Sequence, residues 1–168
     1  MSFIKFMLLF SLLVVGLSYP IDKELRMNQV QVIGSHNSYK QSIEPDLMEM
    51  MVAFNPKAKE LEYGHLPLSK QLDLGLRGLE IDVLYDPEGG RYTRPKGLAM
   101  LEGQGKLAQT YDTSELVNPG FKVLHIPDID FRTHCTTFKG CLSTIKQWSE
   151  QHSNHLPIFI TLNPKTSG

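Results

Sequence analysis

The segment GLEIDVLY, residues 78–85, has the alternating pattern of a β-strand. Successive side chains of a β-strand point to opposite faces, so Glu80 and Asp82 share one face of this segment. Leu79, Ile81 and Val83 share the other face, which is apolar and predicts a covering layer of helices. The strand therefore separates a buried side from a side that carries two carboxylates.

Other strands and helices are predicted along the chain on both sides of this segment. The predicted strands are 28–34 (NQVQVIG), 78–85, 121–126 (FKVLHI) and 157–162 (PIFITL). The predicted helices are 46–54, 66–74 and 137–152, and 86–120 is predicted to be mostly loop. The last strand is a nearly continuous apolar run, which is typical of a strand buried on both faces of a parallel sheet. Strands that alternate with helices indicate an α/β fold built from βαβ units.

The N-terminus has the pattern of a secretory signal peptide over residues 1–18. Lys5 precedes an apolar run from 6 to 15, and Gly16-Leu17-Ser18 supplies small residues ahead of a cleavage point. A membrane anchor is the alternative, but it needs about 20 apolar residues. We therefore expect cleavage after Ser18, a secreted protein, and one catalytic domain over 19–168.

Composition excludes several classes of protein. The 168 residues are 41% hydrophobic and 21% charged, which suits a single globular domain. Lys and Arg number 17 against 18 Asp and Glu, a formal net charge of -1. No basic excess exists to bind nucleic acid, and no sequence feature indicates an obligate protein partner.

Two cysteines, Cys135 and Cys141, are predicted to form a disulfide. In an oxidising compartment two nearby cysteines without a third pair by default. The alternative is two buried free thiols, since Cys141 also falls on the apolar stripe of the predicted helix.

Polar residues lie at or near the C-terminal end of each predicted strand. These residues are His36, Asn37, Glu80, Asp82, His125 and Asn163. In parallel α/β folds the C-terminal ends of the strands converge on the active site, so we expect these side chains to lie together.

The two carboxylates indicate a metal site. Glu80 and Asp82 on one inward face repel each other and lose hydration unless a cation compensates. A divalent ion with oxygen ligands is the simplest solution, and Asn37 and Asn163 could each add an amide oxygen. The alternative is a surface strand whose carboxylates face water.

His36 and His125 supply proton transfer near neutral pH, and a pair of histidines beside a divalent cation suits phosphoryl transfer. Each could instead be an ordinary hydrogen-bonded histidine. The remaining histidines are predicted to face solvent: His65, His134, His152 and His155.

Four motifs in this order resemble the phosphatidylinositol-specific phospholipase C superfamily, and its secreted calcium-dependent branch most closely. They are GSHNSYK (34–40), GLRGLEIDV (75–83), FKVLHIPDIDF (121–131) and LPIFITLNPK (156–165). The similarity runs from about residue 28 to the end of the chain.

The resemblance implies a (β/α)8 barrel that cleaves phosphatidylinositol to diacylglycerol and an inositol phosphate through a cyclic intermediate. It implies that His36 stabilises the pentavalent phosphorus and that His125 protonates the leaving oxygen. It also implies transient contact with a membrane surface, and Ca²⁺ held by Asn37, Glu80 and Asp82, with Glu80 assisting deprotonation of the 2-hydroxyl.

The chain departs from this family in two respects. Relatives often have a further Glu where this chain has Asn163, although an amide can also bind calcium. Two residues after Asn163, Lys165 could face the substrate phosphate, or be a solvated lysine at the strand end.

The second departure is the length of the chain. A complete barrel needs about 250 residues, so the chain is predicted to be the N-terminal half, ending after strand four.

Two other functions remain compatible with the sequence. A glycerophosphodiester phosphodiesterase would share the barrel and the E-x-D strand, but such enzymes usually have His-Arg where this chain has His36-Asn37. A secreted inositol-phosphate or lipid-binding protein without activity would fit Asn163, whereas the presence of both His36 and His125 opposes it.

Overall fold

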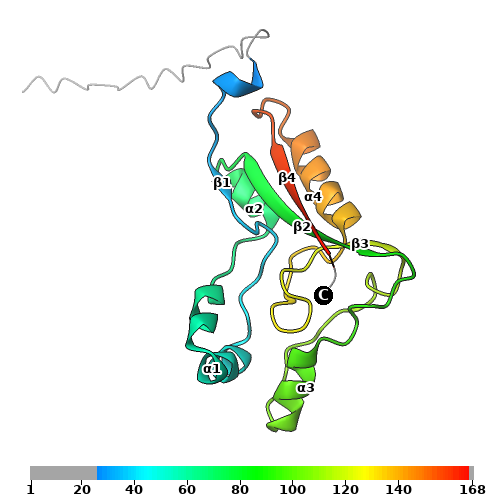
Figure 1. The fold of residues 1–168 in the computed structure, drawn as a ribbon. Coiled ribbons are helices and arrows are strands. Elements are labelled where there is room, and N and C mark those ends of the chain that lie inside the picture. Colours follow the sequence, from blue (N-terminus) through cyan, green and yellow to red (C-terminus); the bar gives the residue numbers. More distant parts are fainter. Residues whose placement is uncertain (1–25, 167–168) are drawn as a thin grey trace, which may run out of the picture. The chain divides into compact units, whose positions relative to one another are not determined.

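A computed structural model describes residues 26–166 of the chain (Figure 1). The chain divides into two units, residues 1–31 and 32–168. The described part of the first unit holds one short 3-10 helix, η1 (Met27–Gln29). Among residues 26–166, no helix has the length and apolar character needed to cross a membrane.

The second unit contains the sheet and the helices. Its strands are β1 (Gly34–Ser35), β2 (Gly78–Asp86), β3 (Gly120–Lys122) and β4 (Phe159–Lys165). Its helices are α1 (Pro45–Phe54), the 3-10 helix η2 (Pro56–Leu61), α2 (Leu68–Asp73), α3 (Lys96–Gly103) and α4 (Phe138–Gln151). The predicted helices at 46–54, 66–74 and 137–152 are confirmed as α1, α2 and α4.

β2 is the central strand of an open, four-stranded sheet. β4 lies parallel to it along its length, from Gly78↔Phe159 to Leu84↔Lys165. β1 is also parallel to β2 and meets only its first two residues. β1 and β2 approach closely at Gly34, where an added Cβ would lie 2.8 Å from the Gly78 carbonyl oxygen. This approach brings the residues that follow β1 directly against β2.

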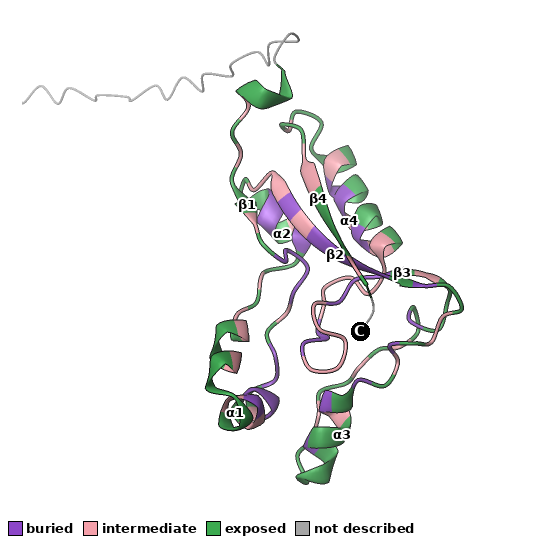
Figure 2. Cartoon of the chain, viewed as in Figure 1, coloured by how far each residue is buried: buried purple, intermediate pink, exposed green. Residues whose placement is uncertain are grey.

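The apolar face of β2 is covered by α2 and α4, as the alternation at 78–85 predicts (Figure 2). Leu79, Ile81 and Val83 are buried in this layer. The helical side chains packed with them are Leu68 and Leu72 from α2 and Cys141, Ile145 and Trp148 from α4. A second apolar cluster joins α1 and α3 to Leu84, Leu124 and Phe131. On the other face of β2, Leu84 therefore packs in this second cluster, while Glu80 and Asp82 belong to the polar site.

One sequence-based prediction in the first 120 residues is wrong, and another is confirmed in part. The strand predicted at 28–34 is reduced to β1, because no strand among residues 26–166 pairs with 28–33. The segment 86–120 is mostly loop, as predicted, but it also contains α3, whose glycines Gly97 and Gly103 weaken its helical signal. Gly97 is required by packing, since an added Cβ would lie 2.7 Å from Leu47 Cδ2.

The third predicted strand, 121–126, is also different. β3 spans only Gly120–Lys122 and is antiparallel to β2, with Tyr85 opposite Phe121. Val123 then leaves the sheet, because its amide donates to the Thr136 carbonyl oxygen at 3.0 Å. β4 therefore pairs with β2 directly, without a parallel third strand between them.

The fourth predicted strand exists as β4, but it is not buried on both faces. Its pattern runs from half-buried to exposed, and Leu162 is 46% exposed. Within the described residues only one edge of β4 is paired, through β2. The sheet is open, so the α/β class with parallel strands and helices is confirmed and the half-barrel stays a prediction.

Candidate active site

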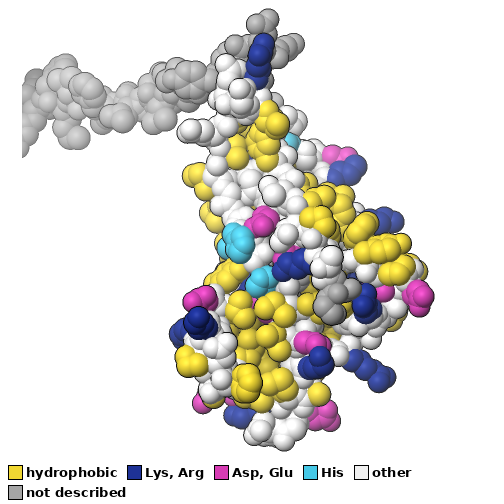
Figure 3. All heavy atoms as spheres, in the orientation of Figure 1, with side chains coloured by type: hydrophobic (Ala, Val, Ile, Leu, Met, Phe, Trp, Pro, Cys, Tyr) yellow, Lys and Arg dark blue, Asp and Glu magenta, His cyan; other side chains and the backbone are white. Residues whose placement is uncertain are grey.

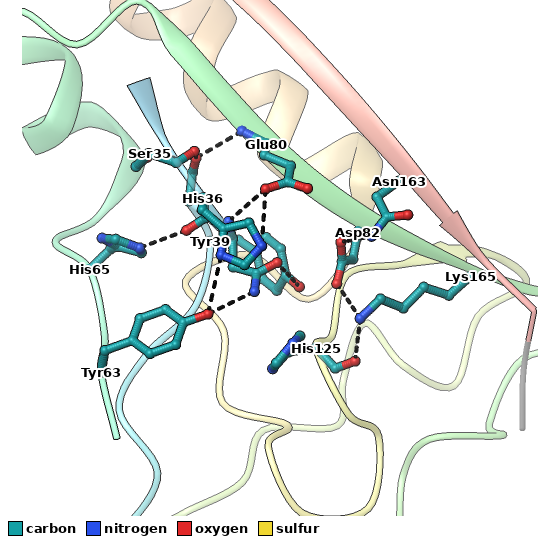
Figure 4. Close-up of polar contacts among 12 residues, drawn as sticks. Ser35, His36, Tyr39, Tyr63, His65, Glu80, Asp82, His125, Asn163 and Lys165 are labelled. Atoms are coloured by element: carbon teal, nitrogen blue, oxygen red, sulfur yellow. Dashed lines mark hydrogen bonds and ion pairs between the residues drawn. The ribbon is translucent and has the colours of Figure 1, made fainter. Parts of the chain in front are cut away.

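Glu80 and Asp82 lie on the same face of β2, opposite the helices (Figure 4). Asp82 is 1% exposed, whereas the Glu80 side chain is 23% exposed. The pair therefore has a buried member and a member that reaches solvent. This placement agrees with the predicted carboxylate face.

The turn after β1 is folded onto Glu80. The Ser38 amide donates to the Glu80 carbonyl oxygen at 2.9 Å, and the Glu80 amide donates to Ser38 Oγ at 2.9 Å. Gln71 of α2 holds the same turn, since its Nε2 donates to the Ser38 carbonyl oxygen at 2.7 Å. Asn37 adopts a positive φ of 49° at the turn. The sequence GSHNS is therefore fixed from both the strand and the helix.

Asn37 is buried and points into the site. Its backbone amide donates to Glu80 Oε2 at 3.2 Å, and its Nδ2 donates to the Tyr63 hydroxyl at 2.8 Å. The Tyr39 hydroxyl donates to Asn37 Oδ1 at 3.4 Å. Burial raises the pKa of Tyr39 strongly, and the Asp82 carboxylate raises it further.

His36 extends from this turn toward solvent, with 72% of its side chain exposed. Its Nε2 lies 3.5 Å from Glu80 Oε2, and its Nδ1 lies 3.5 Å from the Tyr63 hydroxyl. The His36 carbonyl oxygen is 2.7 Å from His65 Nε2. The ring is thus placed between a carboxylate and a phenol and remains accessible to a ligand.

His125 is held by a carboxylate that sequence reasoning missed. His125 Nδ1 is 2.7 Å from Asp130 Oδ2, and Asp130 is fully buried. Because a carboxylate accepts hydrogen bonds, Nδ1 carries the proton and Nε2 is left for chemistry. The spacing H-I-P-D-I-D in the motif at 121–131 contains this signal, but two Asp residues compete for the role.

Lys40 is fully buried and is also a residue that sequence reasoning missed. Its Nζ is 3.3 Å from Asp130 Oδ1 and donates to the Tyr63 carbonyl oxygen at 2.5 Å. The ammonium group lies 4.4 Å from the centre of the Tyr63 ring. Burial lowers the pKa of Lys40, and Asp130 opposes this shift. One buried cation therefore contacts the partner residues of both His36 and His125.

Asp82 is contacted by β4. Asn163 lies opposite Asp82 in the register, and its Nδ2 donates to Asp82 Oδ1 at 2.9 Å. Lys165 Nζ lies 2.5 Å from Asp82 Oδ2 and donates to the His125 carbonyl oxygen at 2.9 Å. Lys165 therefore bridges β2 and the segment that carries His125, as Figure 4 shows.

The side chains of the predicted calcium ligands can be compared with what Ca²⁺ requires. These ligands are Asn37, Glu80, Asp82 and Asn163. All four offer oxygen atoms, which suits a hard cation. Among the described residues, none directs a hydrogen bond to the buried Asp82 Oδ2, although the Lys165 ammonium is adjacent. Residues 26–166 contain no group of three His, Cys, Asp or Glu side chains arranged around a metal. Amide oxygens would therefore have to complete the set.

The four other histidines are not all solvent-facing. His65 and His134 are half-buried and contact each other, with His134 Nε2 2.7 Å from the His65 carbonyl oxygen. That part of the prediction is wrong, because the loop after His125 packs on the segment before α2. His152 is exposed and His155 is half-buried, and both lie against Trp148, away from the site.

The disulfide between Cys135 and Cys141 is present as predicted. Cys141 is fully buried in the core beneath β2, and Cys135 ends the loop that carries His125 and Asp130. The bond therefore ties this loop to α4.

Polar groups of three kinds gather on one face beside a hydrophobic area, as the space-filling view shows (Figure 3). Carboxylates, two imidazoles and an ammonium side by side can bind a phosphate ester and move protons at its oxygens. No curated protein and no solved structure matches the chain. The family model described as phosphoinositide phospholipase C, Ca²⁺-dependent, matches residues 25–168.

Proposed function

Because the chain belongs to the Ca²⁺-dependent phosphoinositide phospholipase C family, we propose that it cleaves phosphatidylinositol into diacylglycerol and an inositol phosphate through a cyclic intermediate. One observation carries the proposal: His36, His125, Glu80 and Asp82 lie together on the open face of β2 (Figure 4). The family assignment gives the phospholipase C class, and the products are part of the proposal.

The reaction we propose begins with attack of the inositol 2-hydroxyl oxygen on phosphorus. The exposed oxygens of Glu80 accept the hydroxyl proton as the new O–P bond forms. His36 lies 3.5 Å from Glu80 and donates a hydrogen bond to the phosphoryl oxygen on which charge develops. This gives the pentavalent phosphorus a donor that is fixed before the substrate arrives.

His125 completes the step at the leaving group. Because Nδ1 of His125 donates a hydrogen bond to Asp130, the protonated form of His125 carries its second proton on Nε2. That proton passes to the diacylglycerol oxygen as the P–O bond breaks. The products are diacylglycerol and a cyclic inositol phosphate, which water then opens.

Calcium belongs to this proposal as a predicted cofactor, and Asn37, Glu80, Asp82 and Asn163 would hold it. It would supply positive charge that lowers the pKa of the 2-hydroxyl and neutralises the phosphate. Asn37 and Asp82 are buried and already oriented by Tyr39, Tyr63 and Lys165. We also propose secretion, with a signal peptide over 1–18, which lies outside the described residues, and transient contact with a membrane surface.

The experiment compares turnover of phosphatidylinositol vesicles by the wild-type chain, His36→Ala and His125→Ala. Each variant should lose at least about 10²-fold in kcat, the usual contribution of a positioned acid or base. His152→Ala, on the far side of β2, is the matched control and should keep wild-type turnover. Wild-type turnover by either site variant would remove that histidine from the mechanism.

Further measurements in this assay distinguish the proposed function from the two other functions compatible with the sequence. Cleavage of glycerophosphoinositol but not of phosphatidylinositol would favour a glycerophosphodiester phosphodiesterase. Binding of inositol phosphate without turnover of either substrate would favour a non-catalytic binding protein. Turnover that persists undiminished in excess chelator would contradict the calcium part of the proposal.

A further inference from the structure

Lys165 has a position that the proposed phosphodiesterase reaction does not explain. Its ammonium group lies against Asp82 and the His125 carbonyl oxygen, at 2.5 and 2.9 Å. The lysine comes from the end of β4, two residues beyond Asn163, which also binds Asp82. Two consecutive inward side chains of β4 are thus directed at one carboxylate.

The burial of Asp82 makes this contact electrostatically important. Asp82 is 1% exposed, and its Oδ2 receives no directed hydrogen bond among the described residues. A buried carboxylate needs a compensating positive charge. The other buried ammonium of this region, Lys40, lies on Asp130 instead. Lys165 is therefore the counter-ion of Asp82.

Asp82 is also the buried carboxylate among the proposed calcium ligands. An ammonium group and a divalent cation cannot both occupy the position next to Asp82 Oδ2, because they repel each other and need the same oxygen. The partner strand adds no third carboxylate, since Asn163 is neutral and its amide nitrogen faces Asp82. Two carboxylates with one ammonium group beside them attract a cation less strongly than two carboxylates alone.

We propose that Lys165 is a built-in competitor for the calcium position, which sets the calcium affinity of this chain. This inference rests on the proposed function of the site. Lys165 holds Asp82 in the metal-free chain and must leave it before a cation can bind there. The side chain is 27% exposed, so its ammonium group can move toward the open face. Once free, it is placed to contact the substrate phosphate.

The test measures calcium binding directly, by isothermal titration of the full chain with CaCl₂. Lys165→Met should bind Ca²⁺ at least about tenfold more tightly than wild type, because the competing charge is gone. Lys165→Arg keeps the charge and should stay near wild type or below. Lys139→Met removes an equal charge from an exposed position on α4 and should leave the affinity unchanged.

The role of Asp82 is tested by a double-mutant cycle. In an Asp82→Asn background, Lys165→Met should no longer tighten calcium binding, because the shared oxygen is lost. If Lys165→Met folds poorly, Lys165→Gln with its thermal unfolding measured at several Ca²⁺ concentrations gives the same comparison. Calcium should then raise the Tm of the variant more than that of wild type.

Equal calcium affinity of wild type and Lys165→Met would overturn the competition. So would the absence of measurable calcium binding in both proteins. Neither result bears on the histidines, whose role is decided by the turnover of His36→Ala and His125→Ala. The failure of this inference and the failure of the proposed function are therefore distinguishable.

Discussion

Asp130 determines what His125 can do. By accepting a hydrogen bond from Nδ1 at 2.7 Å, it orients the ring and leaves Nε2 available for the leaving group. Asp130→Asn should lower kcat by at least about tenfold with a smaller change in KM.

The control for this variant is Asp128→Asn. Asp128 lies two residues earlier, is more exposed, and pairs with Lys96 at the surface. An unchanged kcat in Asp130→Asn, or the same loss in Asp128→Asn, would contradict the role of Asp130.

Tyr39 makes the stability of the fold dependent on alkaline pH. Burial raises its pKa above the ordinary value of 10.0. Above pH 10 the unfolded chain releases this proton while the folded chain keeps it, so the free energy of unfolding falls as pH rises. Tyr39→Phe should reduce that slope by about 1.4 kcal/mol per pH unit.

Urea unfolding between pH 9 and 11.5 measures this slope. Tyr85→Phe is the matched control, because Tyr85 is exposed on β2 and should leave the slope unchanged. An identical slope for wild type and Tyr39→Phe would show that Tyr39 ionises equally in both states.

At the scale of residues, the sequence predicts which face of β2 carries the site, but not the side chains that orient the site residues. The alternation in GLEIDVLY is enough to place Glu80 and Asp82 together, because period-two geometry is local. Lys40 and Tyr63 were missed because their roles depend on contacts across 23 to 90 residues of sequence. Asp130 lies close to His125 in sequence, but Asp128 is an equally good local candidate. A lysine that ends a polar motif carries no local sign that it is buried.

At the scale of elements, the disulfide fixes the loop of His125 to α4 through Cys135 and Cys141. Replacing both cysteines with alanine should lower the free energy of unfolding by about 2–3 kcal/mol, from the loop-entropy model. Guanidinium unfolding measures the loss, and wild type in excess reductant should reproduce it. A double variant as stable as the oxidised wild type would contradict this estimate.

The elements also show which strands can be predicted from sequence. β2 was predicted almost to its bounds because the alternation of its own residues shows both the apolar face and the carboxylate face. β3 was predicted in place but not in direction, since the pairing of a short strand depends on what lies beside it. The hydrogen bond from Val123 to Thr136 is a tertiary contact that no local pattern contains.

At the scale of the whole molecule, one edge of β4 has no strand partner among residues 26–166. Apolar side chains on the helix side of β4 line a groove of about 980 Å³ with α4, on the face opposite the site. An unpaired edge beside apolar surface favours association with another strand. We expect the chain to self-associate as its concentration rises.

Leu162→Lys tests this expectation, because Leu162 is 46% exposed on β4 and a lysine there disfavours edge pairing. Light scattering across a concentration series should show a smaller average mass for the variant than for wild type. Leu107→Lys, at a 97% exposed position in a loop, is the control and should behave as wild type. A concentration-independent monomer in the wild type would contradict the expectation.

The position of Trp148 has a practical consequence. It is the single tryptophan of the chain, and it is buried between α4 and β2 on the side away from His36 and His125. Its Nε1 donates to Asp73 Oδ1 at 2.7 Å, which joins α4 to α2. The tryptophan fluorescence of the protein therefore reports on this helix junction, and gives each site variant an optical check of its folding that is independent of its chemistry.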